Sequence, residues 1–132
     1  MNIKSFLDST YLKTSDQAGL SDDQNKKVVV NCIQEAIDEN FKLIMIRPEM
    51  VSLARKMISD QNSKVNIGTV IDFPKGNSNY SKKINEAKQA IIDGADDLDF
   101  VCNYEEFKKG NTLLLKEEIK DTYYIGSFDN IF

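Results

Sequence analysis

The stretch Leu43-Ile44-Met45-Ile46, followed directly by Arg47-Pro48, constrains the fold more than any other part of the sequence. Four consecutive apolar residues are too few for a helix. A run without polar alternation is typical of a strand that is buried on both faces, as in a parallel sheet. Pro48 stands where the first residue of a following helix is expected. The stretch therefore predicts a buried strand that leads into a helix.

Helix-like and strand-like patterns alternate on both sides of this strand. Upstream, residues 5–11 are predicted to form a short strand, and Ser21 with Gln24 fits a capping box at the start of a helix that ends at Asn40. Downstream, the patterns predict helices over 50–58 and 84–91, strands over 65–71 and 98–103, and weaker helical pieces over 104–109 and 113–120.

This alternation predicts an α/β fold in which right-handed crossovers connect the strands of a parallel sheet. Periodicity alone leaves two architectures open, an open flavodoxin-like sheet and part of a TIM (β/α)8 barrel. The strand order would separate them, since 2-1-3-4 is flavodoxin-like and 1-2-3-4 fits a barrel. A complete barrel usually needs ~250 residues. A chain of 132 residues with four βα units would be about half of one.

Composition excludes several classes of function. The net charge is -4, from 17 basic and 21 acidic residues, which disfavours a nucleic-acid-binding surface. The chain has no histidine, so a Ser-His-Asp triad, a His-ligated zinc site and His acid-base catalysis are excluded. No stretch approaches the ~18 apolar residues of a membrane span. Cys32 and Cys102 are interpreted as reduced thiols. We therefore expect a cytoplasmic domain without a nucleic-acid or membrane partner.

In either parallel architecture, functional residues collect at the carboxyl ends of the strands. Asp99 is the strongest candidate functional residue, because it lies between apolar residues in a strand that is expected to be buried. A buried carboxylate is costly unless it is paired or hydrogen-bonded. It could be a proton-transferring acid/base or a structural acid, and the spacing favours neither. We expect its side chain to face the inside of a barrel.

Other polar residues near the strand ends are weaker candidates for functional residues. Asp8 and Thr10 lie on one face of the first strand by the period of two, and an edge strand with its polar face in water is the favoured explanation for them. The segment 72–77 could face a phosphate, but it lacks a nucleotide-binding fingerprint and is better explained as an ordinary turn. The charged run 82–88, which includes Lys83, is predicted to be a solvated helix face.

The sequence resembles the deoxyribose-phosphate aldolase family in five stretches, which run in family order from about Phe6 to about Glu118. They are Phe6-Leu7-Asp8-Ser9-Thr10-Tyr11-Leu12-Lys13; Leu43-Ile44-Met45-Ile46-Arg47-Pro48; Gly68-Thr69-Val70-Ile71-Asp72-Phe73-Pro74-Lys75-Gly76; Glu86-Ala87-Lys88 through Ala90-Ile91 and Asp93-Gly94-Ala95-Asp96-Asp97-Leu98-Asp99-Phe100-Val101; and Gly110-Asn111. Together, in this order and spacing, they are specific.

The resemblance implies a TIM-barrel class I aldolase. Family members reversibly cleave 2-deoxy-D-ribose 5-phosphate to acetaldehyde and glyceraldehyde 3-phosphate. A lysine forms a Schiff base with the carbonyl, so the resemblance implies neither a metal nor an organic cofactor. The family's acid/base aspartate maps onto Asp99, and its supporting first-strand residues map onto Asp8 and Thr10. A small phosphorylated sugar is the expected ligand of the complete site.

The chain differs from the family in the segment that carries the reacting amine. The family's Schiff-base lysine lies on a sixth strand, and four βα units do not reach it. Lys75, near the carboxyl rim, is expected to be solvated and is not taken as the nucleophile. Residues 1–120 are predicted to form the N-terminal half of an aldolase-type barrel, and residues 121–132 a divergent tail. Met45 stands where some members carry cysteine.

We therefore predict that the isolated chain is an inactive half of an aldolase. The alternative is a half-barrel interaction module, because a half barrel leaves two sheet edges uncovered. Such a module would assemble with itself as a homo-oligomer or with a separate C-terminal half.

Overall fold

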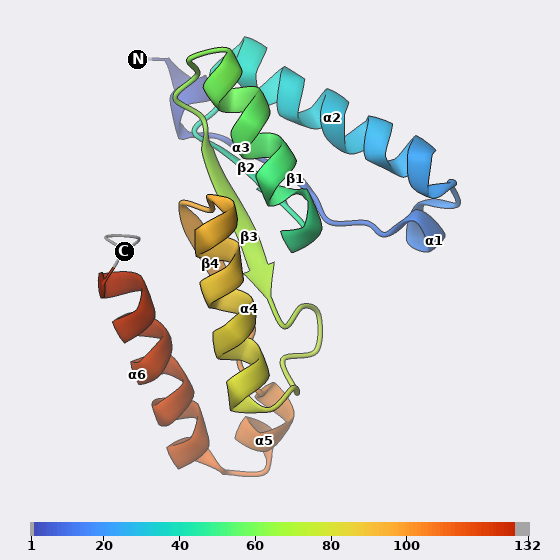
Figure 1. Cartoon of the computed structure of the whole chain (residues 1–132). Helices are drawn as coiled ribbons and strands as arrows, with labels where there is room; N and C mark the ends of the chain where they lie inside the picture. Colours follow the sequence, from blue (N-terminus) through green and yellow to red (C-terminus); the bar gives the residue numbers. More distant parts are fainter. Residues whose placement is uncertain (1, 129–132) are drawn as a thin grey trace.

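A parallel sheet organises the part of the chain that the computed structural model describes, residues 2–128 (Figure 1). Its strands are β1 (Asp8–Tyr11), β2 (Leu43–Ile46), β3 (Asn66–Ile71) and β4 (Asp97–Phe100). They lie in the order β1-β2-β3-β4, and each pair of neighbours is parallel. This sequential order is the one predicted for a barrel segment, and the flavodoxin-like order is wrong for this chain.

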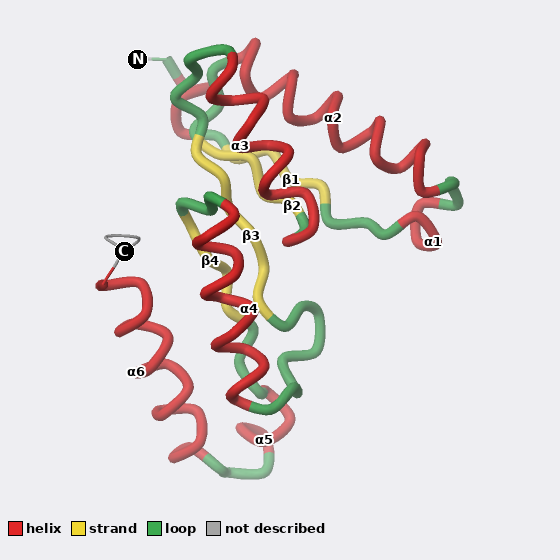
Figure 2. The backbone as a smooth tube through the Cα atoms, in the orientation of Figure 1, coloured by secondary structure: helices red, strands yellow, loops and turns green. Residues whose placement is uncertain are grey.

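The helices lie between and after the strands. They are η1 (Ile3–Phe6), α1 (Ser15–Ala18), α2 (Asp22–Glu39), η2 (Pro48–Met50), α3 (Val51–Asp60), α4 (Tyr80–Asp93), α5 (Tyr104–Lys108) and α6 (Thr112–Phe128). Figure 2 shows α2, α3 and α4 stacked along one side of the sheet, with α6 beyond α4. None of the helices in residues 2–128 is long and apolar enough to cross a membrane.

The main hydrophobic core lies between the sheet and these helices. Its strand members are Ile44, Ile46, Ile67, Ile71 and Leu98, and it includes buried residues of α2, α3 and α4. Every second strand residue therefore faces the helices, as the period of a strand requires. The remaining strand residues face the other side, which we call the inner face because it would line a closed barrel.

Local signals in the sequence set the helix ends. Ser21 and Gln24 form the predicted capping box at the start of α2, and Asn40 ends that helix in the left-handed conformation. Gly94 ends α4 with a φ of 105°. The polar connection between β1 and α2 contains the short helix α1, which the sequence patterns did not predict and which Thr14 and Gln17 cap reciprocally. Four residues are too few to show a helical period.

Several element boundaries differ from the sequence prediction. The strand predicted over 98–103 ends at Phe100, and the helix predicted over 84–91 begins earlier, at Tyr80. The predicted strand over 5–11 is shorter, because η1 occupies its beginning and β1 starts at Asp8. The last helix was expected over 113–120, but α6 continues to Phe128. Residues 121–128 of the predicted divergent tail thus extend a helix, whereas residues 129–132 lie outside the described residues.

Candidate functional site

The inner face of the sheet carries the residues for which the sequence predicted a function. The strand register places Asp8 beside Leu43, Thr10 beside Met45 and Val70 beside Asp99. Leu43, Met45 and Val70 form a small buried cluster with Leu12, separate from the main core. Because laterally paired residues share a face, the predicted polar residues and this cluster lie on the same face.

Asp99 lies on the inner face of β4, between Leu98 and Phe100, which pack toward the helices. Its side chain was expected to be buried, but it is exposed in this chain. The reason is that β4 is an edge strand and none of the elements described in residues 2–128 covers its inner face. The desolvation cost on which the sequence argument rested is therefore largely absent here.

Asp8 and Thr10 lie on the same face as Asp99 but at the opposite edge of the sheet, on β1. Both are exposed. The strands β2 and β3 separate them from Asp99, so the structure puts the three residues on one surface without bringing them into contact. Their joint role stays a prediction.

A hollow of about 510 Å³ lies at the carboxyl end of β4. Asp99 is the one charged residue among those that line it within the described residues. The others are Leu12, Val70, Phe73, Leu98, Phe100, Val101, Cys102 and Tyr104. A single carboxylate in a mostly apolar hollow fits a site that places one acid/base group against a small ligand.

Asp97 is an inner-face carboxylate that the sequence analysis did not select. Burial raises the pKa of this group above its usual value, and the ammonium of Lys42 opposes the shift. Three further carboxylates add to it, those of Asp96, Asp8 and Asp99. The signal in the sequence was the spacing, because residues two apart in a strand share a face. The inner face is thus acidic along both of its edges.

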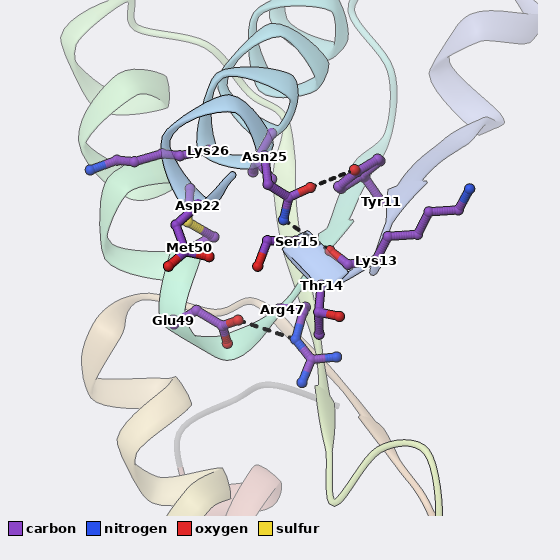
Figure 3. A pocket seen from close by; sticks show the side chains of 11 residues that line it. Tyr11, Lys13, Thr14, Ser15, Asp22, Asn25, Lys26, Arg47, Glu49 and Met50 are labelled. Atoms are coloured by element: carbon purple, nitrogen blue, oxygen red, sulfur yellow. Dashed lines mark hydrogen bonds and ion pairs between the residues drawn. The ribbon is translucent and has the colours of Figure 1, made fainter. Parts of the chain in front are cut away.

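A second pocket, of about 270 Å³, lies between the ends of β1 and β2 (Figure 3). Two pairs of its polar side chains are hydrogen-bonded to each other. The Tyr11 hydroxyl donates to Asn25 Oδ1 (2.6 Å), and Arg47 Nε donates to Glu49 Oε1 (3.1 Å). The side chains of Lys13 and Lys26 point away from the centre in Figure 3. This pocket contains none of the residues predicted to be catalytic.

Lys83 contradicts the prediction that the charged run on α4 is solvated. Its neighbour Lys82 is exposed as expected, but the side chain of Lys83 is 0% exposed. Its Nζ lies 2.9 Å from Glu118 Oε1 and 3.7 Å from Asp72 Oδ2. Burial was possible because two carboxylates compensate the charge.

The chain is similar to deoxyribose-phosphate aldolases by sequence. It is 35% identical over 120 residues to the enzyme of Clostridium botulinum (strain Loch Maree / Type A3), an alignment that covers 91% of this chain and 52% of that protein. It is 31% identical over 126 residues to the enzyme of Thermococcus gammatolerans, covering 96% and 52%. No family model matches the chain.

Solved structures agree with the sequence comparison. The aldolase QR15 superimposes with a TM-score of 0.74 at 27% identity, over 94% of this chain and 51% of that one. A crystal structure from Coccidioides immitis that is described as a deoxyribose-phosphate aldolase gives a TM-score of 0.81 at 27% identity, over 96% and 46%. The tetrameric deoxyribose phosphate aldolase from Aeropyrum pernix, at 22% identity and a TM-score of 0.68, supports the fold alone.

The chain spans about half the length of the curated relatives it matches. Its parallel strands and their order match half of an aldolase barrel. By sequence and by fold, the chain is similar to about half of a deoxyribose-phosphate aldolase.

Proposed function

We propose that this chain supplies one half of a class I aldolase site for the reversible cleavage of 2-deoxy-D-ribose 5-phosphate to acetaldehyde and glyceraldehyde 3-phosphate. The observation that carries the proposal is the position of Asp99 in the apolar hollow at the carboxyl end of β4, in a chain with this similarity. The proposed chemistry uses a Schiff base and needs neither metal nor organic cofactor. A cytoplasmic location stays a prediction.

In this proposal Asp99 transfers the proton of the cleavage step. A lysine amine first condenses with the substrate aldehyde and releases water. The Asp99 carboxylate then accepts the proton of the substrate hydroxyl as the carbon–carbon bond breaks, and the electron pair moves to the iminium nitrogen. Asp8 and Thr10 are assigned supporting roles at the other edge of the inner face, where a hydroxyl and a carboxylate can bind polar substrate groups.

The reacting amine has to come from outside the described sheet. The strands β1 to β4 have the sequences DSTY, LIMI, NIGTVI and DLDF, so none of them places a lysine on the inner face. Lys83 is close to the strand ends, but its ammonium is buried between carboxylates. We therefore infer that the described half is inactive by itself and that further βα units complete the site.

The alternative function, a half-barrel interaction module, rests on the two edges of the sheet. β1 and β4 each have one strand neighbour in the described structure, and Phe6 and Leu7, next to β1, are exposed. An unpaired edge beside exposed apolar residues favours association. Closure by a second copy would place Asp8, Asp97 and Asp99 of both copies around one lumen. A complementary half with cationic inner residues is therefore the better partner.

The test is a retro-aldol assay on the chain alone and on the chain fused to the C-terminal half of the Clostridium botulinum relative. We expect turnover in the fusion only, and borohydride trapping of the substrate on a lysine of the added half. Asp99→Asn in the fusion should lower kcat by about 10²–10⁴-fold. The control Asp60→Asn changes an exposed residue of α3 and should leave kcat unchanged.

Two results would contradict the proposal. One is turnover or lysine trapping in the chain alone. The other is an active fusion in which Asp99→Asn retains full activity. Light scattering of the chain alone tests the alternative, since a stable homodimer would favour closure by a second copy.

A further inference from the structure

Lys83 occupies an unusual place for a lysine, because its ammonium is enclosed where several elements meet. Besides Glu118 and Asp72, Nζ donates to the carbonyl of Val101 at 3.3 Å and lies 5.1 Å from the centre of the Phe100 ring. The side chain is 0% exposed, and those of Glu118 and Asp72 are 3% and 11% exposed. One buried charge thus connects α4, α6 and the ends of β3 and β4.

The two carboxylates that hold Lys83 also hold loop backbone. Asp72 directly follows β3, and it accepts hydrogen bonds from the backbone N–H of Ser78 (2.8 Å) and from the Ser78 hydroxyl (2.6 Å). Glu118, the one buried residue among 112–121 of α6, accepts from the backbone N–H of Asn103 at 3.2 Å. Asp72 therefore fixes the loop 72–78, and Glu118 fixes the segment 101–103.

Both of these segments line the hollow that contains Asp99. Phe73 comes from the first, and Val101 and Cys102 come from the second. They also touch each other, because Gly76 packs so closely on the Cys102 backbone that a Cβ at Gly76 would lie 2.2 Å from the Cys102 carbonyl oxygen. The geometry of the hollow thus depends on where these two segments are held.

We propose that Lys83 is a positioning residue, whose buried ammonium sets the two segments 72–78 and 101–103 around Asp99. It acts directly on the Val101 carbonyl, two residues beyond Asp99, and indirectly through Asp72 and Glu118. Without Lys83, the carboxylates of Glu118 and Asp72 would lose the cation between them, and both loops would shift to hydrate them. The importance of this position for catalysis rests on the proposed function of Asp99.

The test compares the full 15N- and 13C-labelled chain with Lys83→Met, with the double variant Lys83→Met/Glu118→Leu, and with the control Lys82→Met. Lys82 is the exposed neighbour on α4, so its replacement should leave residues 72–78 and 99–103 unchanged. Lys83→Met should shift their amide resonances and the carboxyl carbon resonance of Asp99. It should also raise amide exchange at 101–103 by roughly tenfold or more relative to the control.

The double variant separates positioning from simple stabilisation. It removes both members of the buried ion pair, so the denaturation midpoint should recover toward that of the unmodified chain. The Asp99 carboxyl resonance and the exchange at 101–103 should stay altered, because Val101 and Asn103 have lost their partners. Recovery of these signals together with the midpoint would show a merely structural role and would overturn the proposal. So would a Lys83→Met variant identical to the control.

These measurements are made on the chain without substrate, so they do not depend on turnover. If Asp99→Asn proved harmless in the active fusion, the catalytic proposal would fail while the positioning result could stand. If the Lys83 variants left the hollow unchanged while Asp99→Asn abolished turnover, the reverse would hold. If Lys83→Met fails to fold, the double variant is compared with the single variant Glu118→Leu, so that the difference between the two reports the loss of Lys83.

Discussion

Replacing Gly76 by alanine is expected to destabilise the fold by about 2–5 kcal/mol, through a contact between the two segments that line the Asp99 hollow. Gly76 is buried and has a φ of +64°. An added Cβ would lie 2.2 Å from the carbonyl oxygen of Cys102, and 2.8 Å from its carbonyl carbon and from Val101 Cγ1. That carbonyl accepts a hydrogen bond from Tyr104 N at 2.9 Å, so it cannot move aside freely.

Two separate costs contribute to this magnitude. A residue with a Cβ pays about 1–2 kcal/mol for the left-handed conformation. Forcing extra volume into a packed contact typically costs about 1–3 kcal/mol more. Gly19 provides a matched control, because its φ is +66° and nothing lies within 4 Å of its hypothetical Cβ. Gly19→Ala should therefore show the conformational cost alone.

Urea denaturation followed by far-UV circular dichroism measures both variants. The gain from a less flexible unfolded chain is similar for the two Gly→Ala changes, so it cancels in their difference. We expect Gly76→Ala to be less stable than Gly19→Ala by about 1–3 kcal/mol at equal m-values. If the two variants lose the same stability, the tight packing of the two segments is refuted.

Two further predictions concern the inner face and α2. Burial raises the pKa of Asp97. As the pH rises from about 4, the unfolded chain therefore releases this proton before the folded chain does, and the folded state loses stability. Asp97→Asn does not have this loss, so its free energy of unfolding, relative to that of the unmodified chain, should increase between about pH 4 and pH 7. Urea titrations at several pH values measure this difference, and a flat or falling difference would contradict burial as the cause of the raised pKa. Ser21→Ala removes the side-chain acceptor for Gln24 N and should lower the free energy of unfolding by about 0.5–2 kcal/mol. The control Ser52→Ala, at an exposed position of α3, should lower it much less. Equal losses of stability in thermal denaturation would count against the capping role of Ser21.

Much of the fold could be predicted because the signals that determine it are local. Ser21 and Gln24 are three residues apart, and Asn40 and Gly94 act at the helix ends where they stand. The buried run Leu43–Ile46 needs only its own sequence to be interpreted as a parallel strand. The short helix α1 was missed because its capping contacts, not a hydrophobic period, define it.

The state of the candidate site could not be predicted in the same way, because it depends on elements that lie across the sheet. The alternation of Leu98, Asp99 and Phe100 indicates which face Asp99 takes, but its exposure depends on what covers that face. Sequence reasoning took burial from the apolar neighbours of Asp99, and these neighbours are buried only against the helices. For the same reason the crowding of carboxylates around Asp97 emerges only when β1 and β4 are placed on one sheet.

Lys83 is different, because the helical period indicated its burial, whereas the prediction of a solvated side chain followed its charge. It precedes Ala87 by four residues and Ala90 by seven, and both of those are buried on the core side of α4. The helical period therefore placed it on the apolar stripe, while its charge favoured solvent. Lys83 is buried because its ammonium pairs with Glu118, 35 residues away on α6, and with Asp72 at the end of β3. A charged residue in the buried phase of a helix thus indicates an ion-pair partner elsewhere in the chain, and the sequence pattern alone does not identify that partner.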